Sequence, residues 1–166
     1  MFTDHFPYRK INFDIIDGVI THNFTFFAKS GTRYIVLAEQ YDFFVFAVKF
    51  YNARHKNCSE RFNRLTNKYE CSRVITTVGH IMKDIFNNNP FASFAFIGSQ
   101  LKDEGKSNTK RFRLYSRIIE SLVAPLNFEH RPIPQHSAYI ALNRHNTEPQ
   151  LLEKIEQMFQ HIFVVE

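Results

Sequence analysis

The sequence contains no tryptophan and little cysteine, glycine or proline: two Cys, five Gly and six Pro among 166 residues. Cys58 and Cys71 are too few and too loosely spaced for a disulfide scaffold or a structural zinc site, so we expect two reduced thiols. The low glycine and proline content excludes collagen-like and low-complexity classes. The chain is long enough to bury a sizeable core, and we expect one domain over residues 1–166.

Long apolar runs and known catalytic motifs are also absent. No stretch of about 18 apolar residues occurs, and residues 1–5 lack the basic-then-apolar layout of a signal peptide. We therefore expect a cytoplasmic protein without a membrane partner. Gly98 and Gly105 do not form a nucleotide-binding fingerprint, and neither a nucleophile elbow nor a glycosidase-like carboxylate pair is present. We expect no cofactor, and the question of catalysis stays open.

Aromatic residues are abundant, with 19 Phe and seven Tyr, which indicates a thick core between a sheet and helices. Hydrophobic periodicity predicts five strands, at residues 19–29, 33–39, 43–51, 91–97 and 137–143. It predicts helices from Cys71 to the stop at residues 87–90, over residues 111–123, and after a capping box at residues 147–150. We predict an α+β domain: a five-stranded mixed sheet with an antiparallel N-terminal meander and three helices mostly on one face.

Positive charge is concentrated in two segments of a chain whose net charge is +5. Residues 49–73 contain seven cations and two anions, and residues 102–117 contain six cations and two anions. Such clusters favour anionic partners, with nucleic acid and phosphate esters first among them. A solvated basic face that only aids solubility is the alternative.

The second segment places cations at a helix start. If Asn108 or Thr109 caps the helix, Lys110, Arg111 and Arg113 lie in its first turn, where the helix dipole disfavours positive charge. A bound phosphate could offset that cost at the free N–H groups of the turn. A protein carboxylate could do the same. Ser99 and Tyr115 are the further residues expected to support a phosphate site. If a protein carboxylate pairs with these cations instead, the candidates are Asp84, Glu70 or Glu129.

The first segment is expected to contain a long loop, residues 52–70, with one helical turn near residues 61–65. Arg61, Arg64 and Lys68 alternate with Phe62 and Tyr69, a mixture found in grooves that follow a nucleic-acid backbone. Cations exposed on a loop are the alternative. We also expect this loop to be among the least ordered parts of the domain.

Eight histidines raise the question of metal binding. His130, His136 and His145 lie close in sequence, but neither a His-x-Glu-x-x-His nor a Cys-x-x-Cys spacing accompanies them, so we expect no metal site. His22, on the apolar side of a predicted strand, and His80, within a predicted helix, read as packed histidines.

Several segments resemble a family of uncharacterised bacterial proteins. The similar segments are NPFASFAFIGS at residues 89–99, NTKRFRLY at residues 108–115, and shorter matches at residues 49–51, 61–66, 73–75 and 137–139. The resemblance covers roughly residues 40–145 and consists of a strand ending in Gly-Ser, a variable loop and an Arg-x-Arg-Leu-Tyr helix start. It implies neither a reaction nor a ligand.

The sequence therefore predicts a binding domain for a phosphate-bearing partner, with nucleic acid favoured over a nucleotide. The residues expected to contact phosphate are Lys110, Arg111, Arg113, Arg61, Arg64 and Lys68. Two alternatives stay open: a protein interaction module or homodimer whose basic loop docks on an acidic partner, and a metal-independent ribonuclease that uses Arg, His and Tyr.

Overall fold

The structure, a computed structural model, describes residues 4–57, 70–97, 108–122 and 127–164. These residues form one mixed sheet of seven strands in the order β1-β2-β3-β4-β5-β7-β6. The strands are β1 (Tyr8–Ile16), β2 (Val19–Phe27), β3 (Arg33–Tyr41), β4 (Val45–Asn52), β5 (Ser93–Ile97), β6 (Phe128–Ile133) and β7 (Ala138–Asn143). The helices are α1 (Cys71–Asn88), α2 (Lys110–Leu122) and α3 (Leu151–Val164), with short 3₁₀ turns η1 (Asp42–Phe44), η2 (Ala53–His55) and η3 (Pro134–His136).

The α+β class and the N-terminal antiparallel meander are confirmed, whereas the expected number of strands is wrong. β1 to β4 pair antiparallel in chain order. The two additional strands, β1 and β6, are the outer strands of the sheet. β1 has a bulge between Lys10 and Asn12, and β6 contains Pro132. Both features interrupt the alternating pattern by which strands are recognised in sequence.

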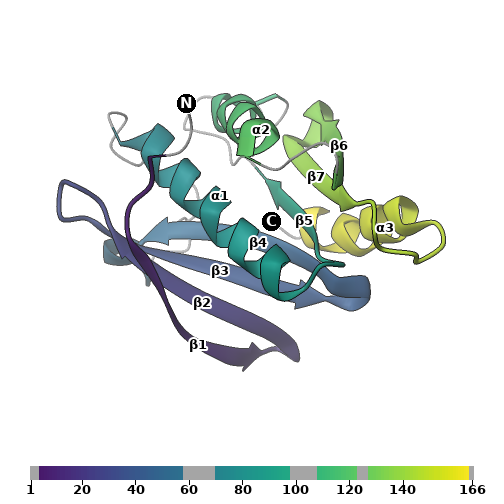
Figure 1. Cartoon of the computed structure of the whole chain (residues 1–166), viewed down its shortest axis with the longest axis horizontal. Coiled ribbons are helices and arrows are strands. Elements are labelled where there is room, and N and C mark those ends of the chain that lie inside the picture. Colours follow the sequence, from purple (N-terminus) through teal and green to yellow (C-terminus); the bar gives the residue numbers. More distant parts are fainter. Residues whose placement is uncertain (1–3, 58–69, 98–107, 123–126, 165–166) are drawn as a thin grey trace.

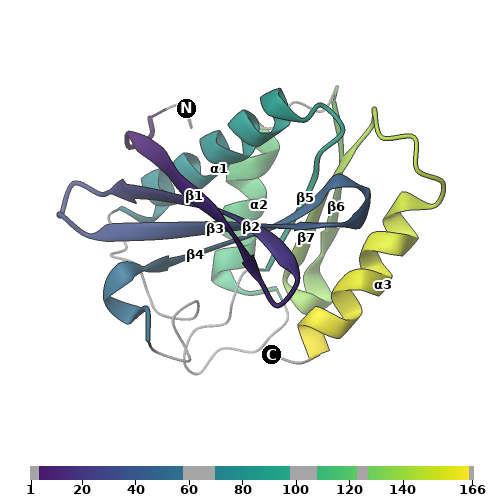
Figure 2. The ribbon, with the colours of Figure 1, turned by 90° about the horizontal axis from the view of Figure 1, so that it is seen from below.

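Two of the three described helices cover one face of the sheet, and the third covers the other (Figures 1 and 2). α1 and α2 pack on the larger core, which includes Phe24, Phe26, Tyr34, Phe94 and Tyr139. α3 packs through Leu151, Ile155 and Phe159 against Val45, Ala47, Ala95 and Ile140 on the opposite face. Adjacent residues of β4 therefore serve two cores, which explains why Val45, Phe46, Ala47 and Val48 are all apolar and all buried.

The helix boundaries follow local sequence signals. α1 begins at Cys71 as expected, and the N–H of Asn89 closes its end by donating to the carbonyls of Ile85 and Phe86. The expected capping box at residues 147–150 is wrong: α3 begins at Leu151, after Gln150 adopts a φ of 53°. Pro149 disfavours helical geometry in the residue before it, so the helix cannot begin at Thr147.

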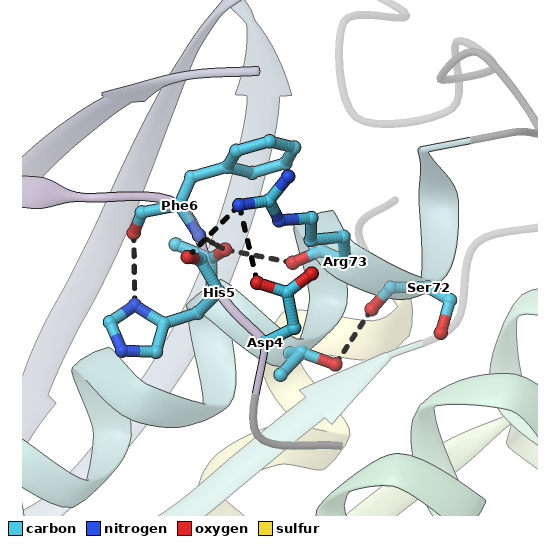
Figure 3. Close-up of polar contacts among 7 residues, drawn as sticks. Asp4, His5, Phe6, Ser72 and Arg73 are labelled. Carbon is cyan, nitrogen blue, oxygen red and sulfur yellow. Dashed lines mark hydrogen bonds and ion pairs between the residues drawn. The ribbon is translucent and has the colours of Figure 1, made fainter. Parts of the chain in front are cut away.

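The segment before β1 is anchored on α1 by several contacts (Figure 3). The Phe6 N–H donates to the Thr77 hydroxyl at 2.9 Å. The Arg73 guanidinium lies 4.0 Å from the centroid of the Phe6 ring and forms an ion pair with Asp4 at 3.3 Å. This segment therefore closes the larger core beside β1, and Phe6 is 4% exposed.

Candidate nucleic-acid interface

Several elements that carry charged residues meet at the side of the sheet where the parallel strands β4 and β5 have their carboxyl ends. In this subsection and the next, an edge means such a row of strand ends, as distinct from the outer strands β1 and β6. β4 pairs parallel with β5, so both strands point their carboxyl ends to this edge. α1 follows β4 and α2 follows β5, which brings the N-termini of both helices to the same edge (Figure 1). The antiparallel neighbours add the β2–β3 connection, η2 and η3. In open α/β sheets, ligands bind at the carboxyl ends of parallel strands.

We call this region the basic edge because of the charges it carries. Its described cations are Lys29, Arg33, Arg54, Lys56, Arg73, Lys110, Arg111 and Arg113, and its described carboxylates are Asp4 and Glu70. The connections at the opposite edge carry Asp17, Asp42 and Glu148 with one arginine, Arg144. The two edges of the described sheet thus differ in the sign of the charge that they carry.

The start of α2 is fixed by side-chain caps. The Thr109 hydroxyl accepts a hydrogen bond from the N–H of Phe112 at 3.1 Å, so Thr109 is the N-cap. The Thr109 N–H donates to the Ser137 hydroxyl at 2.9 Å. Asn108 lies just outside the helix with a φ of 49°, and its N–H donates to the carbonyl of Pro134 at 2.7 Å. The backbone before α2 is thereby bound to the turn that precedes β7.

The three cations of this first turn point in different directions. Arg111 faces inward and is 7% exposed. Lys110 and Arg113 are exposed, and Nη1 of Arg113 donates to the carbonyl of Asn108 at 2.5 Å. Lys110 and Arg113 can therefore reach a ligand in solvent, whereas Arg111 lies behind them in the packed layer.

Arg111 lies near two buried tyrosines, Tyr34 and Tyr115. Burial raises the pKa of Tyr34 to about 12, with Glu70 and Cys71 adding to the effect and Arg111 opposing it. Burial likewise raises the pKa of Tyr115 well above its usual value, again against the influence of Arg111. The ring of Tyr115 packs between Phe50 and Phe96, with centroid distances of 5.7 and 5.4 Å. Both phenols thus stay protonated, and Tyr115 is a core residue.

The carboxylates considered as internal partners of these cations have other contacts. Glu70 accepts from the backbone N–H and the hydroxyl of Ser30, at 2.7 and 2.9 Å. Asp84 accepts from the Tyr8 hydroxyl, and Glu129 pairs with Arg131. Of the three, Glu70 is the one that, like Arg111, affects the pKa of Tyr34, and the two act in opposite directions.

Four candidate residues, Arg61, Arg64, Lys68 and Ser99, lie outside the described residues, as does most of the loop expected to be poorly ordered. The residues that flank them are described. Residues 57 and 70 border the first segment, residues 97 and 108 border the second, and all four lie at the basic edge. Both basic segments of the sequence therefore leave and re-enter the fold at one edge of the sheet.

His130 and His145 take part in hydrogen bonds within the domain. Nδ1 of His130 contacts the buried hydroxyl of Tyr139, and Nε2 of His145 lies 3.0 Å from Oδ1 of Asn127. Burial, and then Glu120, raise the pKa of Tyr139 strongly. Because Tyr139 is 0% exposed, its hydroxyl cannot reach a substrate. Across residues 4–57, 70–97, 108–122 and 127–164, no three metal-ligating side chains gather as a metal site would require.

A groove that the sequence did not reveal lies at the other end of α1. It has a volume of about 520 Å³ and is lined by residues that include Lys10, His22, Gln40, Asp84 and residues 87–89. His22 lies between Lys10 and Gln40, at 3.2 and 3.0 Å. Lysine only donates, so Nδ1 of His22 accepts and Nε2 donates to Gln40. This row of hydrogen-bonded side chains, Lys10, His22 and Gln40, was not predicted, because β1, which carries Lys10, was not expected as a strand.

Comparisons with protein-family profiles, curated proteins and solved structures return no match to this chain. The resemblance to a family of uncharacterised bacterial proteins therefore stays a prediction. Of the helices that the structure describes, none combines the length and apolar composition needed to cross a membrane.

Proposed function

We propose that the protein binds nucleic acid through the phosphate backbone, along the basic edge. The observation that supports this proposal is the convergence of lysines and arginines from separate parts of the chain. Lys29 comes from the β2–β3 connection, Arg54 and Lys56 from η2 and the residue after it, and Lys110 and Arg113 from α2. All five are exposed. Cations spread along an edge suit a polymer with repeated phosphates.

A polymer fits this arrangement better than a single nucleotide does. Nucleotide sites are concave pockets that bury most of their ligand. The groove of about 520 Å³ is lined by residues 87–89, which lie at the carboxyl end of α1 and away from the N-terminus of that helix. The proposal therefore assigns backbone contacts to exposed cations and extends them to Arg61, Arg64 and Lys68, whose flanking residues lie at the same edge.

Within this proposal Arg111 supports the interface from behind. Its guanidinium lies in the packed layer beside Tyr34 and Tyr115. It belongs to the packing behind the first turn of α2 and adds no direct contact to the ligand. Direct contact with phosphate falls to Lys110 and Arg113, with Asn108 and Thr109 shaping the helix start between them.

Salt dependence of binding tests this proposal. Affinity for labelled single- and double-stranded RNA and DNA would be measured by fluorescence anisotropy at several salt concentrations. Each lost phosphate contact lowers the slope of log affinity against log salt by about 0.7 to 0.9. We expect the double variant Lys110→Gln/Arg113→Gln to flatten the slope by more than one, and Arg64→Gln/Lys68→Gln to do likewise.

A matched control removes the same charge from elsewhere. Lys83 and Arg144 are exposed and lie away from the basic edge, so Lys83→Gln/Arg144→Gln should leave the slope within about 0.3 of the wild-type value. If the control Lys83→Gln/Arg144→Gln flattened the slope as much as Lys110→Gln/Arg113→Gln does, the effect would be a non-specific effect of charge, and the assigned interface would be refuted. Absence of binding to every RNA and DNA at low salt would refute nucleic-acid binding and favour an acidic protein partner. Cleavage of the RNA in these mixtures would identify a ribonuclease.

A further inference from the structure

The outer strand β1 is unusually apolar for a solvent-exposed sheet edge. Ile11, Phe13, Ile15 and Ile16 are 45%, 62%, 70% and 50% exposed. β1 has nine residues and pairs with β2 on one side, and among the described strands no other lies beyond it. A long, apolar edge strand is a template for pairing with a further strand, and soluble proteins usually protect such edges.

The turn after β1 determines which residues of the strand direct their backbone outward. Asp17 and Gly18 have φ values of 52° and 80°, as in the type I′ turn of a two-residue hairpin. Ile16 and Val19 flank this turn as a pair and exchange hydrogen bonds. Because hydrogen-bonded and non-hydrogen-bonded pairs alternate, Phe13 and Ile15 turn their N–H and C=O groups away from β2.

Charge along β1 is complementary to its own reverse. Arg9 and Lys10 lie near the start of the strand, Asp14 lies two residues before its end, and Asp17 follows just after it. Two antiparallel copies of β1 would bring the basic start of each strand near the acidic end of the other. A parallel arrangement would align like charges, which is unfavourable.

We propose that β1 pairs antiparallel with β1 of a second copy of this chain, with the two-fold axis at Phe13. This register aligns outward backbone groups of both strands at Phe13 and places Ile11 opposite Ile15 of the second copy. It also places Asn12 opposite Asp14 of the second copy, and it brings Arg9 and Lys10, which precede the bulge, toward the acidic end of the other strand. A register centred on Asp14 would instead oppose two carboxylates, so charge selects the register centred on Phe13.

Asn12 and Asp14, which face each other across the dimer in this register, are both held by Asn23 within each copy. Nδ2 of Asn23 donates to Oδ1 of Asn12 at 3.1 Å and to Oδ2 of Asp14 at 2.7 Å. Both contacts use oxygen acceptors, so Asn12 keeps an amide donor group and Asp14 keeps a second carboxylate oxygen for the contact across the dimer. Each dimer would form this amide–carboxylate contact twice, once on either side of the two-fold axis.

An exchange of the two side chains tests the register. Asn12→Asp would oppose two carboxylates at both symmetric contacts and should weaken dimerisation about tenfold in sedimentation equilibrium. The double variant Asn12→Asp/Asp14→Asn restores one amide and one carboxylate at each contact, and it should recover the wild-type dissociation constant. Both variants keep an oxygen acceptor for Asn23 at each position, so each monomer should remain folded.

A second variant and a second measurement test the edge itself. Phe13→Lys should give a monomer across the concentration range in which the wild type dimerises, with unchanged circular dichroism. In the wild type, exchange of the Phe13 and Ile15 amide hydrogens should slow as protein concentration rises. A wild-type protein that stays monomeric at all concentrations up to about 1 mM would overturn the proposal, as would a dimer that tolerates Phe13→Lys. A dimer whose affinity does not respond to the Asn12 and Asp14 exchange would overturn the register.

Discussion

The imidazole ring of His5 lies on that of His80, with 4.0 Å between the ring centroids. His5 belongs to the segment before β1, and His80 to the middle of α1. Burial lowers the pKa of His80, and nearby His5 and Lys83 add to the effect while Asp84 opposes it. Within the described residues, Nε2 of His80 is buried without a hydrogen-bond partner, so the neutral ring is the form that fits this contact.

This contact predicts a loss of stability in mild acid. Because the folded pKa of His80 lies below 6.5, the unfolded chain binds the proton more readily as the pH falls through that value. The free energy of unfolding should therefore decrease from pH 7.5 to pH 5.5. Urea titrations at the two pH values should show a smaller decrease for His80→Gln than for the wild type. His136 is exposed, so His136→Gln should keep the wild-type decrease, and an unchanged decrease in His80→Gln would contradict the assignment.

The N-cap of α2 predicts a second effect on stability. Thr109→Val keeps the volume of the side chain but removes the oxygen that accepts from the Phe112 N–H. We expect a loss of about 1 to 2 kcal/mol in the free energy of unfolding. Thr109→Ser retains the cap and loses one buried methyl group, for about 0.8 kcal/mol or less. A serine variant less stable than the valine variant would show that packing, and not capping, is the main role of Thr109.

Substitution of Arg111 should mainly lower stability, whereas substitution of Lys110 should mainly weaken binding. Arg111→Met removes a buried guanidinium beside two tyrosines and should cost about 2 kcal/mol in urea unfolding. Lys110→Met changes an exposed residue and should alter stability by less than about 0.5 kcal/mol. If the basic edge binds nucleic acid as proposed, Lys110→Met weakens binding and folded Arg111→Met binds with nearly wild-type affinity. The reverse order of affinities would place Arg111 in direct contact with phosphate.

Asn143 joins the end of β7 to the connection between α1 and β5. Its side chain is 2% exposed, and Nδ2 donates to the carbonyls of Pro90 and Ala92 at 2.7 and 2.8 Å. Asn143→Asp would replace this donor by a carboxylate facing two carbonyls, at a cost of about 3 kcal/mol or more near neutral pH.

A neighbouring asparagine supplies the control for this change. Nδ2 of Asn146 donates to the carbonyls of Phe43 and Phe91 at 2.8 and 3.2 Å, and its side chain is only half-buried. Asn146→Asp should therefore cost less than half as much as Asn143→Asp in thermal or urea unfolding. Equal losses in the two variants would mean that burial at Asn143 does not set the cost.

The inner strands and the helices could be predicted because their burial is regular. In β2, Thr21, Asn23 and Thr25 alternate with His22, Phe24 and Phe26, as the two faces of a strand require. β1 could not be predicted in this way. Its residues are exposed on both faces, and the bulge after Lys10 shifts the alternation by one residue. The position of α3 on the opposite face was also beyond the sequence, since an apolar stripe does not specify which face of a sheet it covers.

The candidate interface was predictable in its local geometry and not in its side-chain directions. The capping role of Thr109 follows from its place before the apolar stripe of α2. The inward direction of Arg111 has a signal too, because Arg111, Tyr115 and Ile118 follow helical spacing and share one face. Arg54 and Lys56 belong to a basic segment that the sequence shows, whereas Lys29 lies outside both basic segments and had no such signal. The arrival of α2 at the same edge depends on the parallel pairing of β4 with β5.

The parallel pair β4–β5 also has a consequence for the order in which the chain folds. It consists of three residue pairs, Val45 with Ser93, Phe46 with Phe94 and Ala47 with Ala95. The meander β1–β4 closes through short turns, whereas this joint must first bring together residues separated by an entire helix, and loop-closure entropy makes such contacts slower to form. During synthesis, we expect residues 8–52 to acquire hydrogen-bonded structure first. Until β5 arrives, the outer side of β4 is a second open strand edge on the nascent chain, and a chaperone that shields extended segments would find its binding site there.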